Sequence, residues 1–176
     1  QITGGKYNSL QIKTPDYDNI KPTLSKTRQG IFNALAALTE FEGKVFFDMF
    51  AGSGIMSLEA ISRGFRAITF EKDRKTALAI KRSFEGLKIT PELFIGDCIK
   101  NIEKVDIQAD VVFLDPPYES DLYEEALNAI KTNKKLNAGG IVIMEHPITK
   151  EIKYEGYNFI KAKTYGDKQI SYIKLS

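Results

Sequence analysis

The tetrapeptide Asp115-Pro116-Pro117-Tyr118 directly follows the apolar run Val111 to Leu114. Two successive prolines fix their φ angles and lack a backbone N–H, so this turn is rich in hydrogen-bond acceptors. The Asp115 carboxylate and the Pro116 carbonyl can each accept a hydrogen bond from an exocyclic amino group, which directs the nitrogen lone pair toward an electrophilic methyl carbon. Tyr118 can stack on an extruded base. We predict that these four residues are catalytic.

A second group of residues lies at Asp48-Met49-Phe50-Ala51-Gly52-Ser53-Gly54, after the apolar run 45–47 and before a helical pattern. In open parallel sheets, ligands bind beyond the carboxyl ends of the strands, and glycine lets the backbone approach a ligand closely. Glu71 follows Gly52 by nineteen positions, at the end of the next strand, where an acidic side chain can accept hydrogen bonds from ribose hydroxyls. The spacing therefore predicts a nucleoside cofactor.

The charge of this segment indicates which nucleoside. A dinucleotide fingerprint has a third glycine and directs a helix N-terminus at a pyrophosphate, whereas here the third position is Ser57. The carboxylate of Asp48 would repel a phosphate but suits the ammonium group of S-adenosylmethionine. We expect Asp97 to contact the adenine and Cys98 to be a small packed residue beside it. The predicted cofactor-binding residues are Asp48, Phe50, Ala51, Gly52, Ser53, Gly54, Glu71, Lys72, Asp97, Cys98 and Asp115.

Each motif also has a simpler explanation. A Pro-Pro dipeptide can merely end a strand, Tyr118 can pack on the surface, and Glu71 and Asp97 can be solvated. The motifs follow successive strands in the order that a cofactor site and its catalytic turn require, and this favours the functional interpretation. His146 is expected to be a hydrogen-bonded structural residue rather than a base.

The elements that must position these motifs are short β-branched and aromatic runs that alternate with helical patterns, which predicts a buried, mostly parallel sheet. A helix with apolar positions Ile31, Leu35 and Leu38 is expected after a cap at Thr23 or Ser25. A turn at 165–167 predicts a closing antiparallel hairpin. The expected strands are 45–47, 67–70, 93–95, 111–114, 141–144, 150–162 and 169–175, and the expected helices are 55–64, 73–87, 98–104 and 120–132.

Composition narrows the class of protein. With 176 residues, of which 43% are hydrophobic, the chain is expected to form a single domain, 1–176, in which an N-terminal ribbon and loop, 1–20, precede a catalytic core, 21–176. No signal peptide or membrane span is expected, and we predict a cytoplasmic protein. The single cysteine, Cys98, and the absence of paired Cys/His spacings give no reason to expect a metal. The net charge of +2 neither demands nor excludes a nucleic-acid partner.

These motifs together resemble the RsmD-type family, bacterial methyltransferases that modify guanine N2 in 16S ribosomal RNA. Asp115 to Tyr118 is similar to the family's catalytic turn and Asp48 to Gly54 to its cofactor motif. The similar blocks elsewhere are Ile2 to Gly5, Lys21-Pro22-Thr23 with Arg28 and Ile31-Phe32-Asn33, Leu58-Glu59-Ala60, Ser62-Arg63-Gly64, Gly166-Asp167 and Ser171-Tyr172.

The resemblance implies a Rossmann-like class I methyltransferase fold with a seven-stranded, mostly parallel sheet, S-adenosylmethionine as donor, and 16S rRNA in an assembled or partly assembled small subunit as the substrate. Residues 1–13 have no helical period and are expected to form a small ribbon outside the sheet, and nothing in the sequence suggests more than a monomer. Basic residues cluster near the N-terminus, where they can contact phosphate. The predicted RNA-binding residues are Lys6, Lys21, Thr23, Lys26, Arg28 and Lys168.

Three other functions compete with this one. An adenine-N6 DNA methyltransferase shares the catalytic tetrapeptide but is expected to carry a target-recognition domain, for which 176 residues leave little room. A nicotinamide-dependent oxidoreductase is disfavoured by Asp48, by Ser57 and by the lack of a hydride-transfer base. A non-catalytic RNA-binding protein would have no need of an intact Asp115 to Tyr118 turn.

Overall fold

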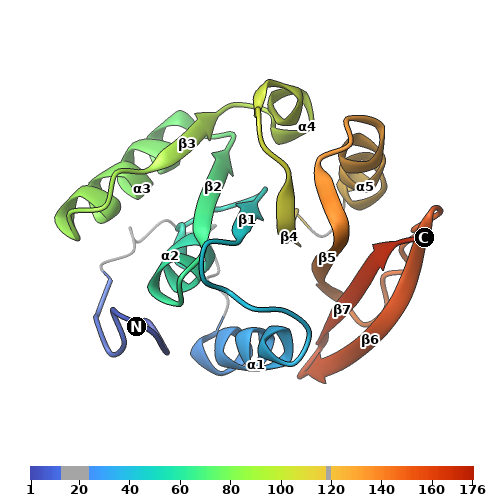
Figure 1. Cartoon of the computed structure of the whole chain (residues 1–176), viewed down its shortest axis with the longest axis horizontal. Helices are drawn as coiled ribbons and strands as arrows, with labels where there is room; N and C mark the ends of the chain where they lie inside the picture. The colour runs from blue at the N-terminus through green and yellow to red at the C-terminus, as the bar shows by residue number, and fades with distance from the viewer. Residues whose placement is uncertain (13–23, 118–119) are drawn as a thin grey trace.

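In the computed structural model, which describes residues 1–12, 24–117 and 120–176, seven strands form one sheet in the order β3-β2-β1-β4-β5-β7-β6 (Figure 1). Strands β3, β2, β1, β4 and β5 are parallel to one another, and β7 is antiparallel to both β5 and β6. Their bounds are β1 Val45–Asp48, β2 Arg66–Glu71, β3 Glu92–Ile95, β4 Ala109–Leu114, β5 Leu136–Pro147, β6 Tyr157–Tyr165 and β7 Lys168–Leu175.

The helices cover both faces of this sheet. On one face lie α1 Ser25–Ala36, α2 Ile55–Ser62 and α3 Arg74–Gly86, and on the other α4 Cys98–Asn101, the 3-10 turn η1 Ile102–Lys104 and α5 Leu122–Thr132 (Figure 1). Two covered faces explain why β4 and residues 140–146 of β5 are buried at nearly every position, as parallel strands usually are. Within residues 1–12, 24–117 and 120–176, no helix has the length and apolar character needed to cross a bilayer.

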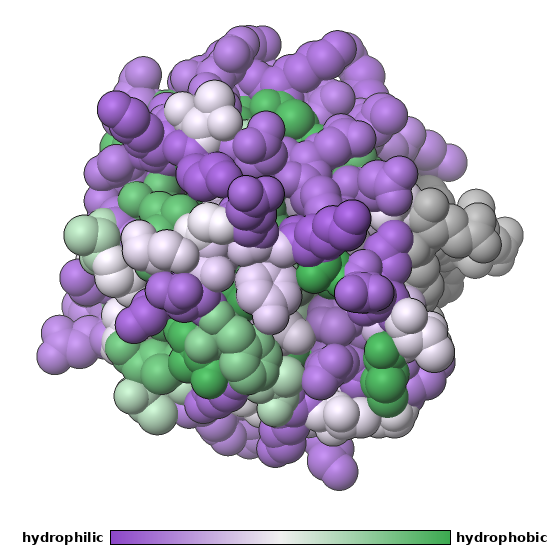
Figure 2. Space-filling view, turned by 90° about the vertical axis from the view of Figure 1, so that its right-hand side faces the viewer, coloured by the Kyte–Doolittle hydropathy of each residue, from purple (hydrophilic) through white to green (hydrophobic). Residues whose placement is uncertain are grey.

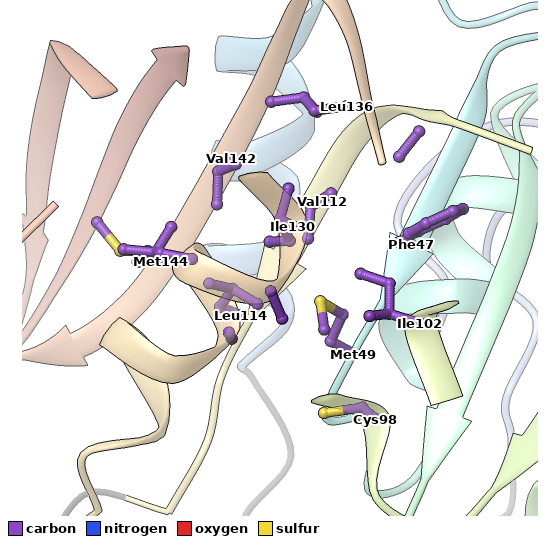
Figure 3. Close-up of a cluster of buried hydrophobic side chains, with 14 of the residues drawn as sticks. Phe47, Met49, Cys98, Ile102, Val112, Leu114, Ile130, Leu136, Val142 and Met144 are labelled. Atoms are coloured by element: carbon purple, nitrogen blue, oxygen red, sulfur yellow. The ribbon is translucent and has the colours of Figure 1, made fainter. Parts of the chain in front are cut away.

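Apolar side chains fill the layers between sheet and helices. Beneath α4 and α5, the strand residues Phe47, Val112 and Leu114 pack against Ile102 and Ile130 (Figure 3). On the opposite face a second cluster joins α1 and α2 to the sheet through Phe32, Phe46, Met56, Val111 and Ile143. The two layers fix the sheet between the helices. Because the strands from β3 to β5 are parallel to one another, their carboxyl ends lie at one edge of this sheet.

Most of the predicted elements are confirmed, with differences at their ends. Helix α1 begins at Ser25 after Leu24, which has no side-chain cap, and it ends at Ala36, so Leu38 lies beyond it. Thr23, the other expected cap, lies outside the described residues. The segment 98–104 is divided into α4 and η1, and the tail strand expected over 150–162 begins only at 157, where β6 starts pairing with β7.

The N-terminal ribbon that we expected is a compact loop, and residues 1–12 contain no strand. Two backbone hydrogen bonds close it, from Ile2 N to Leu10 O (3.0 Å) and from Ser9 N to Ile2 O (2.9 Å). Ile2 is fully buried against α2 and α3. The loop is bound to the end of α2 by hydrogen bonds from Lys6 N to Ser62 O (2.6 Å) and from Tyr7 N to Ser62 Oγ (2.9 Å). Packing on α2 thus replaces the strand pairing that a ribbon would have made.

Candidate active site

The acidic residues of the site follow neighbouring strands. Asp48 ends β1, Glu71 ends β2, Asp115 follows β4, and Glu145 lies near the end of β5. The pairing of Asp48 with Thr69 of β2 and with Phe113 of β4 brings these strand ends to one edge of the sheet. The site is therefore assembled from the carboxyl ends of parallel strands, where ligands bind in open α/β sheets.

The loop 49–54 carries the glycines of the predicted cofactor motif. Gly52 and Gly54 adopt φ values of 56° and 78°, in the left-handed region that favours glycine. Gly54 is the N-cap of α2, and a Cβ there would lie 3.1 Å from Ile80 Cγ2. Hydrogen bonds from Ala51 N to Phe70 O (3.0 Å) and from Gly52 N to Glu71 Oε2 (2.7 Å) hold the loop against the end of β2. The backbone is thus arranged for a ligand to approach closely.

Glu71 joins this loop to the start of α3. Its Oε2 accepts a hydrogen bond from Gly52 N, and its Oε1 accepts one from Asp73 N (2.9 Å). A carboxylate oxygen can accept a second hydrogen bond, and Glu71 remains partly exposed. Glu71 can therefore still accept hydrogen bonds from ribose hydroxyls, while the backbone N–H groups of Gly52 and Asp73 fix the position of its carboxylate.

Asp48 is buried, and its two carboxylate oxygens have different surroundings. Oδ2 accepts hydrogen bonds from Ser57 N (3.1 Å) and Ser57 Oγ (2.8 Å), and the Ser57 hydroxyl also lies 2.7 Å from Thr69 Oγ1. Oδ1 is buried without a hydrogen-bond partner among the described residues. Burial raises the pKa of Asp48 to about 7, although the Ser57 hydrogen bonds oppose this. An ammonium group donating to Oδ1 would satisfy it, so the unpartnered oxygen fits the methionine moiety of S-adenosylmethionine.

The residues expected near the adenine lie at the end of β3. Asp97 is exposed and caps α4, because its Oδ1 accepts a hydrogen bond from Ile99 N (2.9 Å). Cys98 is buried beside Met49 (Figure 3), and burial raises the pKa of its thiol to about 12. The thiol therefore stays protonated near neutral pH, in keeping with a packing role. Phe50 packs partly buried against the same cluster, and Lys72 is exposed.

The catalytic turn begins at the half-buried Asp115, which is followed by the buried Pro116 and the exposed Pro117. Tyr118 lies outside the described residues. Burial raises the pKa of Asp115 well above its usual range; the nearby Glu145 carboxyl and Asp48 also raise it, whereas Lys168 lowers it. Asp115 and Glu145 lie side by side, because the residues that precede them, Leu114 of β4 and Met144 of β5, are paired.

Glu145 is a site residue that sequence reasoning missed. It is 1% exposed, and its Oε1 lies 3.0 Å from Lys168 Nζ on β7. The available signal was its position directly after the apolar run 141–144, because Asp48, Glu71 and Asp115 also stand at strand ends. His146 is confirmed as a hydrogen-bonded structural residue, with Nε2 2.8 Å from Ser171 Oγ and Nδ1 2.9 Å from Pro147 O.

The prediction that Arg28 contacts RNA is wrong. Its side chain is buried and pairs with Glu59, with Nε 3.3 Å from Oε1, and it donates further hydrogen bonds to Gln1 O and Ser25 Oγ. Burial lowers its pKa, although Glu59 opposes this. The physical reason is that Glu59 on α2 is itself fully buried and needs a cation, which Arg28 supplies from α1.

A groove of ≈ 490 Å³ lies beside Glu145. It runs between the start of α1, Glu145 and the β6–β7 hairpin, and it contains Lys26 and Lys168 of the predicted RNA-binding residues together with Lys163, which we had not predicted. Lys6 is exposed on the N-terminal loop, and Lys21 and Thr23 lie outside the described residues. On the side of the molecule that carries β6, mostly hydrophilic residues surround an apolar patch (Figure 2).

Comparison with known proteins gives consistent results. A family model described as "Conserved hypothetical protein 95" matches residues 1–174. The chain is 27% identical over 150 residues to "Ribosomal RNA small subunit methyltransferase D" of Escherichia coli (strain K12), covering 84% of this chain and 75% of that protein.

Solved structures share the fold. The Escherichia coli protein yhhF has a TM-score of 0.86 and 23% identity, covering 99% of this chain and 97% of its own. The SAH-bound Podospora anserina methyltransferase PaMTH1 has a TM-score of 0.71 and 15% identity, covering 93% of this chain and 83% of its own.

The strand order and the likeness to solved methyltransferases define a class I methyltransferase fold. The relatives named as methyltransferases indicate S-adenosylmethionine as the cofactor. Within this class, the chain belongs to the family described as Conserved hypothetical protein 95, which is the RsmD-type family.

Proposed function

We propose that this protein transfers a methyl group from S-adenosylmethionine to the exocyclic N2 amino group of a guanine in 16S ribosomal RNA. The observation that carries the proposal is the acceptor turn at Asp115 and Pro116, which shares one edge of the sheet with the unsatisfied oxygen of Asp48. A donor held at Asp48 and an amine held at Asp115 would then meet above β1 and β4, which are adjacent strands.

Each residue of the site has a role in this reaction. Asp48 would hold the ammonium group of the donor, and Glu71 its ribose. Asp115 and the Pro116 carbonyl would accept the two hydrogens of the amine, orienting a lone pair that is otherwise delocalised into the ring. Bound S-adenosylmethionine would supply a methyl group on a sulfonium, from which a neutral thioether leaves without further activation. The amine loses one proton to solvent as the N–C bond forms and the S–C bond breaks.

The choice of rRNA rests on the curated relatives, several of which are named as small-subunit rRNA methyltransferases. The groove beside the turn supports an anionic substrate, because it carries the ammonium groups of Lys26 and Lys163. We further propose that residues 1–176 act as one domain and as a monomer in the cytoplasm, with residues 1–20 contributing to RNA contact. The substrate would be a small ribosomal subunit in which the target guanine can leave its stack.

The test uses S-adenosylmethionine labelled on the methyl group. The protein is incubated separately with naked 16S rRNA, with small-subunit particles that lack the modification, and with DNA, and mass spectrometry then identifies the modified nucleoside. We expect N2-methylguanosine from the rRNA or the particles. Label in N6-methyladenine from the DNA arm would replace the proposal with the competing one, and no label in any arm would reject it.

A further inference from the structure

Two carboxyl groups and one ammonium group lie next to the catalytic turn. Leu114 of β4 pairs with Met144 of β5, so the residues that follow them, Asp115 and Glu145, lie side by side, and Glu145 is paired with Lys168 at 3.0 Å. The side chains of Glu145 and Lys168 are 2% and 16% exposed, so this pair is well shielded from solvent. Burying an ion pair carries a desolvation penalty that the pairing often does not offset. An ion pair buried beside the reacting group is therefore a candidate for a functional role.

Two adjacent carboxylates repel each other, so side-by-side carboxyl groups favour a state in which one of them carries a proton. The position of Lys168 decides which one. Its ammonium group contacts Glu145, so the negative charge is favoured on Glu145 and the proton on Asp115.

The other charged groups around Asp115 act in the same direction or lie farther out. Asp48 faces it from β1 and adds a second negative charge, which also favours a neutral Asp115. In the groove beyond Glu145, the charged residues are Lys26 of α1, Lys163 of β6, Asp167 in the hairpin turn and Lys168 of β7. Of these, Lys168 is the one with an ion pair to Glu145.

We propose that Glu145, held by Lys168, is a positioning residue that keeps Asp115 as a neutral acid whose hydroxyl donates to Glu145 and whose carbonyl oxygen faces the amine. This inference rests on the proposed function for the identity of the amine. In this arrangement the negative charge lies on Glu145, and the neutral Asp115 carboxyl stands between it and the reacting nitrogen. Asp115 then resembles an amide side chain, which also has one donor group and one acceptor oxygen.

A titration by carbon-13 NMR of protein labelled at the aspartate carboxyls tests the proton directly, without any substrate. Asp115→Asn identifies the Asp115 signal. We expect Asp115 to be protonated at neutral pH, with Glu145→Gln lowering the pH at which it titrates. Glu151→Ala, which removes an exposed glutamate, is the matched control and should leave the titration unchanged. Titration of Asp115 near its ordinary value of about 4, or no shift in Glu145→Gln, would overturn the proposal.

Single-turnover rates with saturating S-adenosylmethionine then test the role in transfer. Asp115→Asn should stay within about tenfold of the wild-type rate, because the amide keeps the acceptor oxygen and donates to Glu145, whereas Asp115→Ala should be slower by about 10²–10³-fold. The wild-type rate should fall at alkaline pH as Asp115 ionises beside Glu145, and Asp115→Asn should lack this fall. If wild-type protein is active and Asp115→Asn is as slow as Asp115→Ala, the inference fails. If wild-type protein methylates none of the nucleic acids, the proposed function fails and the NMR titration still decides the inference.

Discussion

Asp48 and Asp115 are both acidic residues whose pKa is raised by burial, yet their neighbours differ. Asp48 accepts hydrogen bonds from Ser57, which stabilise its ionised form. Asp115 contacts a second carboxyl group, which stabilises its neutral form. The same residue type can therefore bind a cationic donor at one position and orient an amine at the other, as the environment of each carboxyl sets its charge.

Removing the Asp115 side chain should separate transfer from cofactor binding. In Asp115→Ala, the acceptor that orients the amine is absent, whereas the glycine loop, Asp48 and Glu71 remain. We expect methyl transfer to fall by about 10²–10³-fold while the affinity for S-adenosylhomocysteine, measured by calorimetry, changes little. Turnover equal to that of the wild type would reject the mechanism.

Asp48 should make cofactor binding depend on pH. The ionised carboxylate binds the ammonium group, and its pKa in the free protein is about 7, so the affinity for S-adenosylmethionine should strengthen as pH rises through about 7. Asp48→Asn keeps the shape but not the charge. It should weaken binding by about 1.5–3 kcal/mol, the range for a hydrogen bond to a charged group.

Calorimetric titrations between pH 5.5 and 7.5, values chosen to bracket the pKa of about 7, measure both effects. In Asp48→Asn, the affinity for S-adenosylmethionine should not increase as the pH rises through about 7, as it does in the wild type. An identical pH dependence in the two proteins would assign the effect to the ligand and not to Asp48.

At the scale of elements, α2 carries the glycine loop at its N-terminus and holds the N-terminal loop at its other end. Glu59 of α2 is fully buried and accepts hydrogen bonds from Thr3 N (2.6 Å), Arg28 Nε and Arg63 Nε (both 3.3 Å). Three segments therefore converge on one carboxylate. The N-terminal loop and α1 are fastened to the same helix that begins at the cofactor site.

Replacing Glu59 by alanine should destabilise this junction. It removes the carboxylate from two buried or nearly buried arginines, and such a change costs about 3–5 kcal/mol. Urea unfolding measures the decrease in stability, and faster hydrogen exchange at Thr3 N would localise it. Glu85→Ala is the control, because the exposed Lys81–Glu85 pair is expected to contribute less than about 1 kcal/mol. Equal decreases in the two variants would contradict the structural role of Glu59.

At the scale of the whole molecule, the charge that matters for RNA is local. The net charge is only +2, and the lysines of the groove come from α1 and from the β6–β7 hairpin, which are far apart in the chain. The hairpin lies at the opposite end of the sheet from β3 and α3 (Figure 1). The structure thus offers one candidate RNA-binding side and a distant side for comparison.

Lys26→Ala and Lys163→Ala should each weaken RNA binding. For each phosphate group that a variant no longer neutralises, the slope of log K against log salt should become shallower by about 0.7–0.9. Lys81→Ala on α3 is the matched control and should leave the slope unchanged. Fluorescence anisotropy with an rRNA fragment at several salt concentrations measures this, and unchanged slopes in both groove variants would remove the groove from the RNA-binding surface.

Much of the fold was predictable from sequence because it depends on local patterns. Apolar β-branched runs between helical segments predicted a mostly parallel sheet, and residues directly following those runs predicted the cofactor loop, Glu71 and Asp115. These predictions need only the order of elements, because the carboxyl ends of parallel strands meet at one edge whatever the details of packing. Helix ends were less predictable, and so was the N-terminal loop, whose form depends on its packing and hydrogen bonds against α2.

Only the tertiary structure decided which charged residues face solvent and which face each other. Arg28 and Glu59 are 31 positions apart, and Glu145 and Lys168 are 23 apart, so nothing local in the sequence marks either pair. A lone arginine near the N-terminus looks like a phosphate contact until a buried carboxylate is found beside it. The sequence by itself determined the chemical groups at each strand end, while the fold determined their partners and hence their charge, because a carboxyl group's ionisation depends on the groups that surround it in space.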